Sequence, residues 1–213
     1  PNLPRRGRIV YTIARGRSGF TVGRATHEWQ HDGQHYRMTA TAETTGIAAL
    51  FKSVKAVQTS EGGFQQGELR PERFHFDRGN GEINSARFDW PGQQVTLGDG
   101  QVVPIAAGAE DFLSMFYQLA QAAQRGEGFV MAVATGKKVE RYAFEWLGEE
   151  TLNLPFGAVP AWHVRAQSAA AGKDFTEVWL AKDMAGLPVK IRNTDRKGEV
   201  YEQTAEAIDY ESE

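Results

Sequence analysis

Residues 20–45 read FTVGRATHEWQHDGQHYRMTATAETT, two runs of alternating side chains on either side of Asp32-Gly33. Asp-Gly is a preferred pair in two-residue hairpin turns. Such a turn places Trp29 opposite Tyr36 on a largely apolar face. The other pairs that it predicts are His31–Gln34, His27–Met38, Ala25–Ala40, Glu28–Arg37 and Gln30–His35. The sequence therefore predicts an antiparallel hairpin with one face turned to a core.

Strand signals of the same kind recur along the chain. Turn residues such as Gly79-Asn80-Gly81 and Asp99-Gly100 return about every 8–15 residues, with β-branched and aromatic runs between them. In 187–191 the apolar residues alternate, and Pro188 must begin that strand or lie at an edge, because proline has no N–H. We expect a mainly β fold: a single antiparallel, strongly curved sheet that resembles an open barrel or half-barrel.

One segment departs from this alternation. Residues 110–124 carry apolar side chains at helical spacing: Phe112, Leu113, Phe116, Leu119, Ala120 and Ala123. Asp111 suits the N-cap and Gly126 the stop, which predicts one main α-helix near 110–125. A shorter segment, 46–51, is either a helical turn or a loop. We expect residues 1–7 to be the tail of a linker and 8–213 to form a single β-rich domain.

Composition narrows the class of protein. The 213 residues are 41% hydrophobic and 24% charged, with no cysteine and a net charge of −3. Disulfides and thiolate chemistry are thereby excluded, and a basic stripe for nucleic acid is missing. The chain contains no apolar run long enough to cross a membrane. Because it starts at Pro1 rather than at Met, we expect that a signal, anchor or linker precedes it.

Charge is distributed unevenly between the two ends. Residues 1–24 hold six arginines and no acid, whereas residues 199–213 hold six acids and no base. Two interpretations are open: two solvated terminal faces, or terminal strands that lie side by side and pair these charges. The second would help to close a barrel-like sheet.

His27-Glu28-Trp29-Gln30-His31 matches the H-E-x-x-H pattern of zinc hydrolases. That chemistry requires a helix, where the two histidines share one face. On the predicted strand they stand roughly 13 Å apart, too far for two side chains to meet at one ion. We therefore expect hairpin histidines, no metal and no cofactor, and keep zinc hydrolysis as a remote alternative.

The aromatic content has the most functional weight. The chain holds five Trp, six Tyr and twelve Phe. These residues either pack a plain core or line an apolar cavity inside the curved sheet. For the second case we expect the ligand-binding residues Trp29, Tyr36, Phe116, Phe144, Trp146 and Trp179. Arginines near the rim would then meet an anionic head group.

Several stretches together resemble the bacterial family of domain of unknown function 3108. They are Leu3-Pro4, Tyr11, Trp29 with Asp32-Gly33 and Tyr36, Thr45-Gly46-Ile47 with Leu50-Phe51, Gly67–Phe74, Asp111-Phe112-Leu113-Ser114, Val178-Trp179-Leu180 with Asp183, and Leu187–Ile191. The resemblance covers nearly the whole chain. It implies an exported protein of the Gram-negative envelope and no established activity. The expected fold is similar to that of the LolA and LolB lipoprotein carriers, which is analogy at the level of fold.

Taken together, these patterns favour a non-catalytic envelope protein that binds a lipid-like or other amphiphilic ligand. The helix near 110–125 would act as a lid or plug over the cavity. The alternative is a scaffold that holds an envelope protein partner through a sheet edge or its arginine-rich N-terminal region. We expect no nucleic-acid partner and no transmembrane segment in this chain.

Overall fold

A computed structural model describes residues 3–123, 126, 128–168 and 174–211 of the chain. These residues form one sheet of 15 strands and two helices. The strands are β1 (Arg6–Arg15), β2 (Phe20–His31), β3 (His35–Thr44), β4 (Lys55–Gln65), β5 (Glu68–Asp77), β6 (Ile83–Asp89), β7 (Gln94–Leu97), β8 (Val102–Pro104), β9 (Glu110–Asp111), β10 (Phe129–Ala134), β11 (Val139–Leu154), β12 (Gly157–Ser168), β13 (Phe175–Ala181), β14 (Pro188–Thr194) and β15 (Val200–Tyr210). The helices are α1 (Gly46–Phe51) and α2 (Ser114–Ala123).

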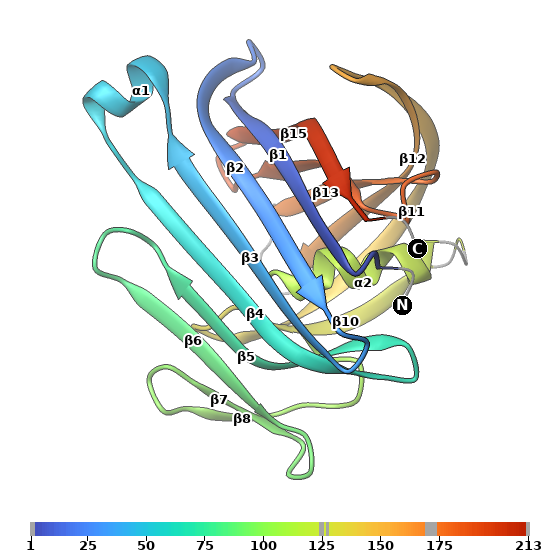
Figure 1. Ribbon diagram of the computed structural model, residues 1–213. Coiled ribbons are helices and arrows are strands. Elements are labelled where there is room, and N and C mark those ends of the chain that lie inside the picture. Colours follow the sequence, from blue (N-terminus) through green and yellow to red (C-terminus); the bar gives the residue numbers. More distant parts are fainter. Residues whose placement is uncertain (1–2, 124–125, 127, 169–173, 212–213) are drawn as a thin grey trace.

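The strands form an antiparallel meander with one short parallel pair, β9 with β10. Their order across the sheet is 8-7-6-5-4-3-2-1-15-14-13-12-11-10-9. The sheet curves around α2 without closing into a barrel (Figure 1). A mainly β fold with one curved, open sheet is therefore confirmed.

The core lies between α2 and the face of the sheet that α2 covers, here called the inner face. Alternation along each strand sends every second side chain to this face. Ile9 and Tyr11 on β1 are fully buried there, and Leu113 and Met115 reach it from the start of α2. The helix thus fills the concave side of the sheet with side chains.

The hairpin of β2 and β3 is present, but its register differs from the prediction. His31 pairs with Tyr36 and Trp29 with Met38, two residues away from the pairs that a two-residue turn would give. The reason is Asp32, whose carboxylate accepts the backbone N–H groups of Gln34 and His35 at 2.8 and 2.7 Å and so widens the loop.

This shift also changes the charged partners in the hairpin. The predicted opposition of Glu28 to Arg37 is wrong. Glu28 instead pairs with Arg8, 3.2 Å away on β1, and Arg37 pairs with Glu61 on β4. Because the shift is an even number of residues, each side chain keeps its predicted face.

The terminal strands lie side by side, as one of the two interpretations of the charge pattern predicted. β1 pairs with β15 from Gly7–Tyr210 to Arg15–Tyr201. Arg15 contacts Glu199 at 2.7 Å, and Arg24 on β2 contacts Glu206 at 3.1 Å. Opposite charges thus join the two ends of the chain, although the sheet stays open between β8 and β9.

Two predicted boundaries differ from those observed. The helix begins at Ser114, because Glu110-Asp111 forms β9, and residues 124–125 of the predicted helix lie outside the described part. Asp111 nevertheless caps the helix as predicted, since its Oδ1 accepts the N–H groups of Leu113 and Ser114 at 2.8 Å each.

The N-terminal segment is ordered further upstream than a linker tail ending at residue 7 would be. β1 begins at Arg6. The carbonyl of Pro4 accepts the indole N–H of Trp29 at 2.9 Å. In the part of the chain that the structure describes, no helix has the length and apolar character needed to span a membrane.

Candidate functional site

Two adjacent acids, Glu110 and Asp111, lie at the centre of the molecule. They form β9, which pairs with Val133 and Ala134 of β10 and leads directly into α2. Both are buried, Glu110 with 1% and Asp111 with 0% of its surface exposed. Buried carboxyl groups are uncommon unless they are paired or hydrogen-bonded, so their partners decide what they do.

A chain of hydrogen bonds satisfies both carboxyl groups. Ser114 Oγ donates to Glu110 Oε2 at 2.5 Å, and Ser60 Oγ donates to Asp111 Oδ2 at 2.5 Å. Tyr36 OH extends the chain, 3.1 Å from Ser60 Oγ. Side chains from β3, β4, β9 and α2 therefore meet in one buried polar network.

Burial sets the protonation of this network. It raises the pKa of Glu110 well above its ordinary value, with a further rise from the neighbouring Asp111 and Glu68. It raises the pKa of Asp111 to about 6, against backbone hydrogen bonds that favour the charged form. A protonated Glu110 can both donate and accept a hydrogen bond, which an ionised carboxylate cannot.

Glu110 also forms part of the wall of a pocket of about 250 Å³. The pocket lies between α2, the start of β5 and β10. Its polar lining is Glu68, Glu110 and Gln118, and its other lining residues are Ala107, Gly108, Ala122, Gly128, Phe129, Val130 and Met131. The lining thus offers both hydrogen-bonding groups and hydrocarbon.

Phe129, one of the apolar lining residues, belongs to an aromatic stack. Phe129 lies parallel to Phe144, with ring centroids 4.7 Å apart and an interplanar angle of 7°. Gln118, one of the polar lining residues, is held in place because its Oε1 accepts the N–H of Leu69 at 2.9 Å. Such a lining suits a small amphiphile: an apolar body with a head that donates hydrogen bonds to acidic groups.

The predicted ligand-binding residues fall into two groups. Five belong to the inner-face core: Trp29, Tyr36, Phe116, Phe144 and Trp146. Of these, Phe144 supports the pocket wall and Tyr36 belongs to the polar network. Trp179 is buried too, but it lies on the opposite face of the sheet from Val178, where it pairs with His163.

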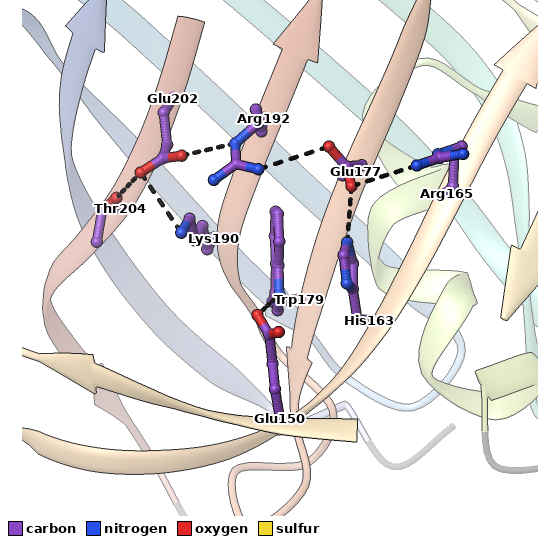
Figure 2. Close-up of polar contacts among 9 residues, drawn as sticks. All are labelled: Glu150, His163, Arg165, Glu177, Trp179, Lys190, Arg192, Glu202 and Thr204. Atoms are coloured by element: carbon purple, nitrogen blue, oxygen red, sulfur yellow. Dashed lines mark hydrogen bonds and ion pairs between the residues drawn. The ribbon is translucent and has the colours of Figure 1, made fainter. Parts of the chain in front are cut away.

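Trp179 is instead the centre of a charged cluster on the outer face (Figure 2). Its ring stacks on His163 with centroids 4.1 Å apart, and its indole N–H donates to Glu150. Lys190 and Arg192 lie over the ring at 4.7 and 5.0 Å from its centroid. Only 2% of Trp179 is exposed, since the four side chains that contact its ring cover it.

Acids link the cations of this cluster into a continuous network (Figure 2). Glu177 contacts His163 at 2.9 Å, Arg192 at 3.7 Å and Arg165 at 3.9 Å. Glu202 contacts Arg192 at 2.8 Å and Lys190 at 3.5 Å. Each cation in the network has an acidic partner, so the cluster ties β12–β15 together rather than presenting free charge to a ligand.

The H-E-x-x-H motif lies on β2, as predicted, and both of its imidazoles have other partners. His27 Nδ1 is 2.9 Å from Tyr117 OH in the core, and burial lowers the pKa of His27 to about 4. His31 Nε2 donates to the carbonyl of Leu3 at 3.0 Å. Among the described residues, no three His, Asp or Glu side chains are grouped to hold a metal.

The sequence did not single out Glu68, Gln118 or Met131 as pocket residues. The adjacent acids 110–111 were visible, but they were interpreted as a helix start, and that interpretation explains only Asp111. The burial of Glu110 depends on β5 and β10 closing over it, which no local pattern encodes.

The sequence matches a family model along most of its length. The model is that of a protein of unknown function (DUF3108), and it matches residues 9–205. The chain belongs to the DUF3108 family. The predicted resemblance is therefore confirmed, and the match includes the pocket, the polar network and the Trp179 cluster. No curated protein matches this DUF3108 chain significantly.

Solved structures resemble the DUF3108 protein to different degrees. A β-barrel-like DUF1849 protein from Brucella abortus is 11% identical with a TM-score of 0.64, over 98% of both chains. The MucA/MucB complex of Pseudomonas aeruginosa gives 0.38 at 13% identity, over 97% of this chain and 52% of that one. A domain from Vibrio parahaemolyticus assigned to outer membrane lipoprotein sorting gives 0.27 at 9% identity, over 97% and 86%. Only the first score supports a shared fold.

Proposed function

We propose that this DUF3108 protein is a non-catalytic binding protein of the bacterial envelope, and that its ligand is a small amphiphile held beside Glu110. The observation that carries the proposal is the mixed lining of the pocket. Glu68, Glu110 and Gln118 supply its polar groups, and Phe129 and Met131 supply large apolar side chains.

The charge of the polar lining residues indicates which kind of head group the ligand has. Glu68 would repel an anion, whereas a hydroxyl, amide or amine can donate to both Glu68 and Glu110. This differs from the arginine-bound anionic head that the sequence suggested. The ligand that fits best is therefore neutral or cationic at its head, with a short hydrocarbon body against Phe129 and Met131.

Binding fits the site better than catalysis because the buried groups are already bonded to one another. Ser114 and Ser60 donate to the acids inside the core, and both serines are fully buried, so neither hydroxyl is open to a substrate. The network holds Glu110 in place against α2, as a preformed binding site requires.

Native mass spectrometry of protein purified gently from a bacterial envelope tests the proposal, with an organic extract analysed beside it. We expect a stoichiometric extra mass that extracts as an amphiphile. Ala122→Leu places a larger side chain in the pocket and should remove that mass. Ala143→Leu, at an exposed position of β11, is the control and should keep it.

Two results would contradict the proposal. One is a bare protein mass that persists after incubation with a total extract of envelope lipids. The other is an extra mass that Ala122→Leu and Ala143→Leu leave equally unchanged, since the ligand would then lie elsewhere.

A further inference from the structure

A second surface of the molecule is apolar without being buried. Ten large hydrophobic residues are exposed in the described part of the chain, and six lie at one end of the strands. We call these six the apolar rim: Phe20, Ile47, Leu50, Phe51, Ile83 and Tyr201. Leu50 and Phe51 are the most exposed of the ten, at 84% and 87%.

The register of the strands places the rim at one end. Arg15 of β1 faces Phe20 of β2 on one side and Tyr201 of β15 on the other. α1 follows β3 at this same end, where Thr45 N–H donates to the carbonyl of Val22 on β2. Figure 1 shows α1 projecting beyond the ends of β3 and β4.

Ile83 reaches the same end through β4 and β5. Val57, near the start of β4, pairs with Asp77 at the end of β5, which pairs in turn with Ile83 at the start of β6. The turn between β5 and β6 lies against the start of β4, since a Cβ at Gly79 would stand 2.1 Å from the carbonyl oxygen of Lys55. Four separate connections of the chain thus contribute to the rim.

Packing within the protein does not explain the apolar side chains of α1. None of its residues is buried, and no side chain caps its start at Thr45. A single exposed apolar residue is ordinary, but a group of large ones at one end of a protein marks an interaction surface. The side chains of Leu50 and Phe51 point away from the protein and need an apolar medium to be covered.

Two cations at the rim form no ion pair with the described residues. Arg17 lies in the turn between β1 and β2, and Lys52 follows Phe51 directly; both are exposed and neither forms an ion pair within the described chain. Of the acids nearby, Glu199 is bound to Arg15 and Glu82 to Arg78 and Lys137, whereas Asp77 and Asp195 accept backbone N–H groups of their own turns. On β3, Glu43 lies opposite Arg24 of β2 on one side and opposite Lys55 of β4 on the other.

We propose that the apolar rim docks onto the surface of an anionic lipid bilayer, with Leu50 and Phe51 inserted among the acyl chains and Arg17 and Lys52 at the phosphate level. Apolar side chains flanked by cations are the combination that holds interfacial segments on such membranes. Insertion needs no rearrangement, because these side chains already project from the protein.

Docking at the rim fixes how the molecule faces the membrane. β4 runs from Lys55 at the rim to Gln65, and β5 begins at Glu68 in the pocket wall. The pocket therefore lies at the far end of β4 from the bilayer. The docking proposal is independent of what the pocket holds, so either proposal can fail without the other.

Co-flotation of the whole protein with vesicles tests docking. We expect the protein to float with vesicles of phosphatidylethanolamine and phosphatidylglycerol, and less with vesicles of phosphatidylcholine alone. Leu50→Glu with Phe51→Glu should weaken binding to the anionic vesicles by roughly tenfold or more. Val102→Glu with Phe156→Glu adds the same charge at exposed positions outside the rim and should bind as the parent does.

A charge variant separates the two parts of the surface. Arg17→Gln with Lys52→Gln should reduce binding to the anionic vesicles and leave the weak binding to phosphatidylcholine unchanged. All variants alter exposed side chains, and equal thermal unfolding midpoints show that they fold. The proposal is overturned if the parent protein fails to float with anionic vesicles, or if the Leu50 and Phe51 variant floats as the parent does; a protein partner would then be the occupant of the rim.

Discussion

The indole ring of Trp29 occupies the space in which a side chain at position 7 would stand. A Cβ built on Gly7 would lie 2.1 Å from Cζ2 of Trp29, much closer than van der Waals contact. Gly7→Ala should therefore displace a buried ring whose N–H is bound to Pro4. We expect it to lower the free energy of unfolding by about 2–3 kcal/mol, measured by chemical denaturation.

A double-mutant cycle distinguishes this contact from a general effect of alanine. In a Trp29→Phe background the smaller ring can move away, so Gly7→Ala should cost less than it does in the parent. Equal costs in the two backgrounds would show that the ring is not the obstacle.

The free energy of unfolding should respond to pH in opposite directions through two buried groups, Asp111 and His27. Asp111 has its pKa raised from 3.8 to about 6, so its contribution is full below pH 3.8 and is lost as the pH rises through 6. His27 has its pKa lowered from 6.5 to about 4, so its contribution is full above pH 6.5 and is lost as the pH falls through 4. Burial causes both shifts.

Single variants should separate these responses between pH 4 and 6.5. Relative to the parent, Asp111→Asn should become more stable as the pH rises, and His27→Gln less stable, each by up to about 3 kcal/mol across the window. Urea denaturation at a series of pH values measures both slopes. Slopes of the same sign for the two variants would contradict the assignment.

Glu177 should matter more to stability than an exposed acid in a similar pair. Its side chain is 10% exposed and contacts His163, Arg165 and Arg192 together. Glu177→Gln leaves these cations without their shared partner and should cost about 3 kcal/mol. The matched variant Glu61→Gln, whose Arg37 partner is 57% exposed, should cost less than about 1 kcal/mol.

The head-group preference of the pocket can be tested on β5. Glu68→Gln removes a negative charge from the pocket wall, and Glu72→Gln makes the same change at an exposed position of the same strand. If the ligand has a cationic or donating head, Glu68→Gln should lower its occupancy in native mass spectra about tenfold, and Glu72→Gln should leave it unchanged. Higher occupancy in Glu68→Gln would indicate an anionic head instead.

The hairpin of β2 and β3 shows how far sequence reasoning reached. Alternation predicted both strands and their faces, and these are confirmed. The register was wrong because Asp32 was treated as a backbone turn residue, whereas its side chain accepts two N–H groups and widens the loop. Two hydrogen bonds to one side chain thus outweigh the preference of the Asp-Gly pair.

Trp179 and Glu110 show where prediction from sequence stops. Val178, Trp179 and Leu180 are all buried, although neighbouring residues on a strand face opposite ways. Val178 and Leu180 belong to the core on the inner face, and the side chains of the charged cluster cover Trp179 on the outer face. Glu110 is likewise buried by strands far from it in the sequence, so both sites depend on long-range curvature that one strand cannot encode.

The strand order has a consequence for how the chain assembles. Every neighbouring pair in the sheet is consecutive in sequence except β1 and β15. The halves β1–β8 and β9–β15 can therefore form by pairing strands that are consecutive in sequence. The seam between β1 and β15 forms only when the two ends of the chain meet. Arginines on one side of that seam and glutamates on the other attract across this long separation. Salt, which screens such attraction, should slow the joining of the halves more than the formation of either.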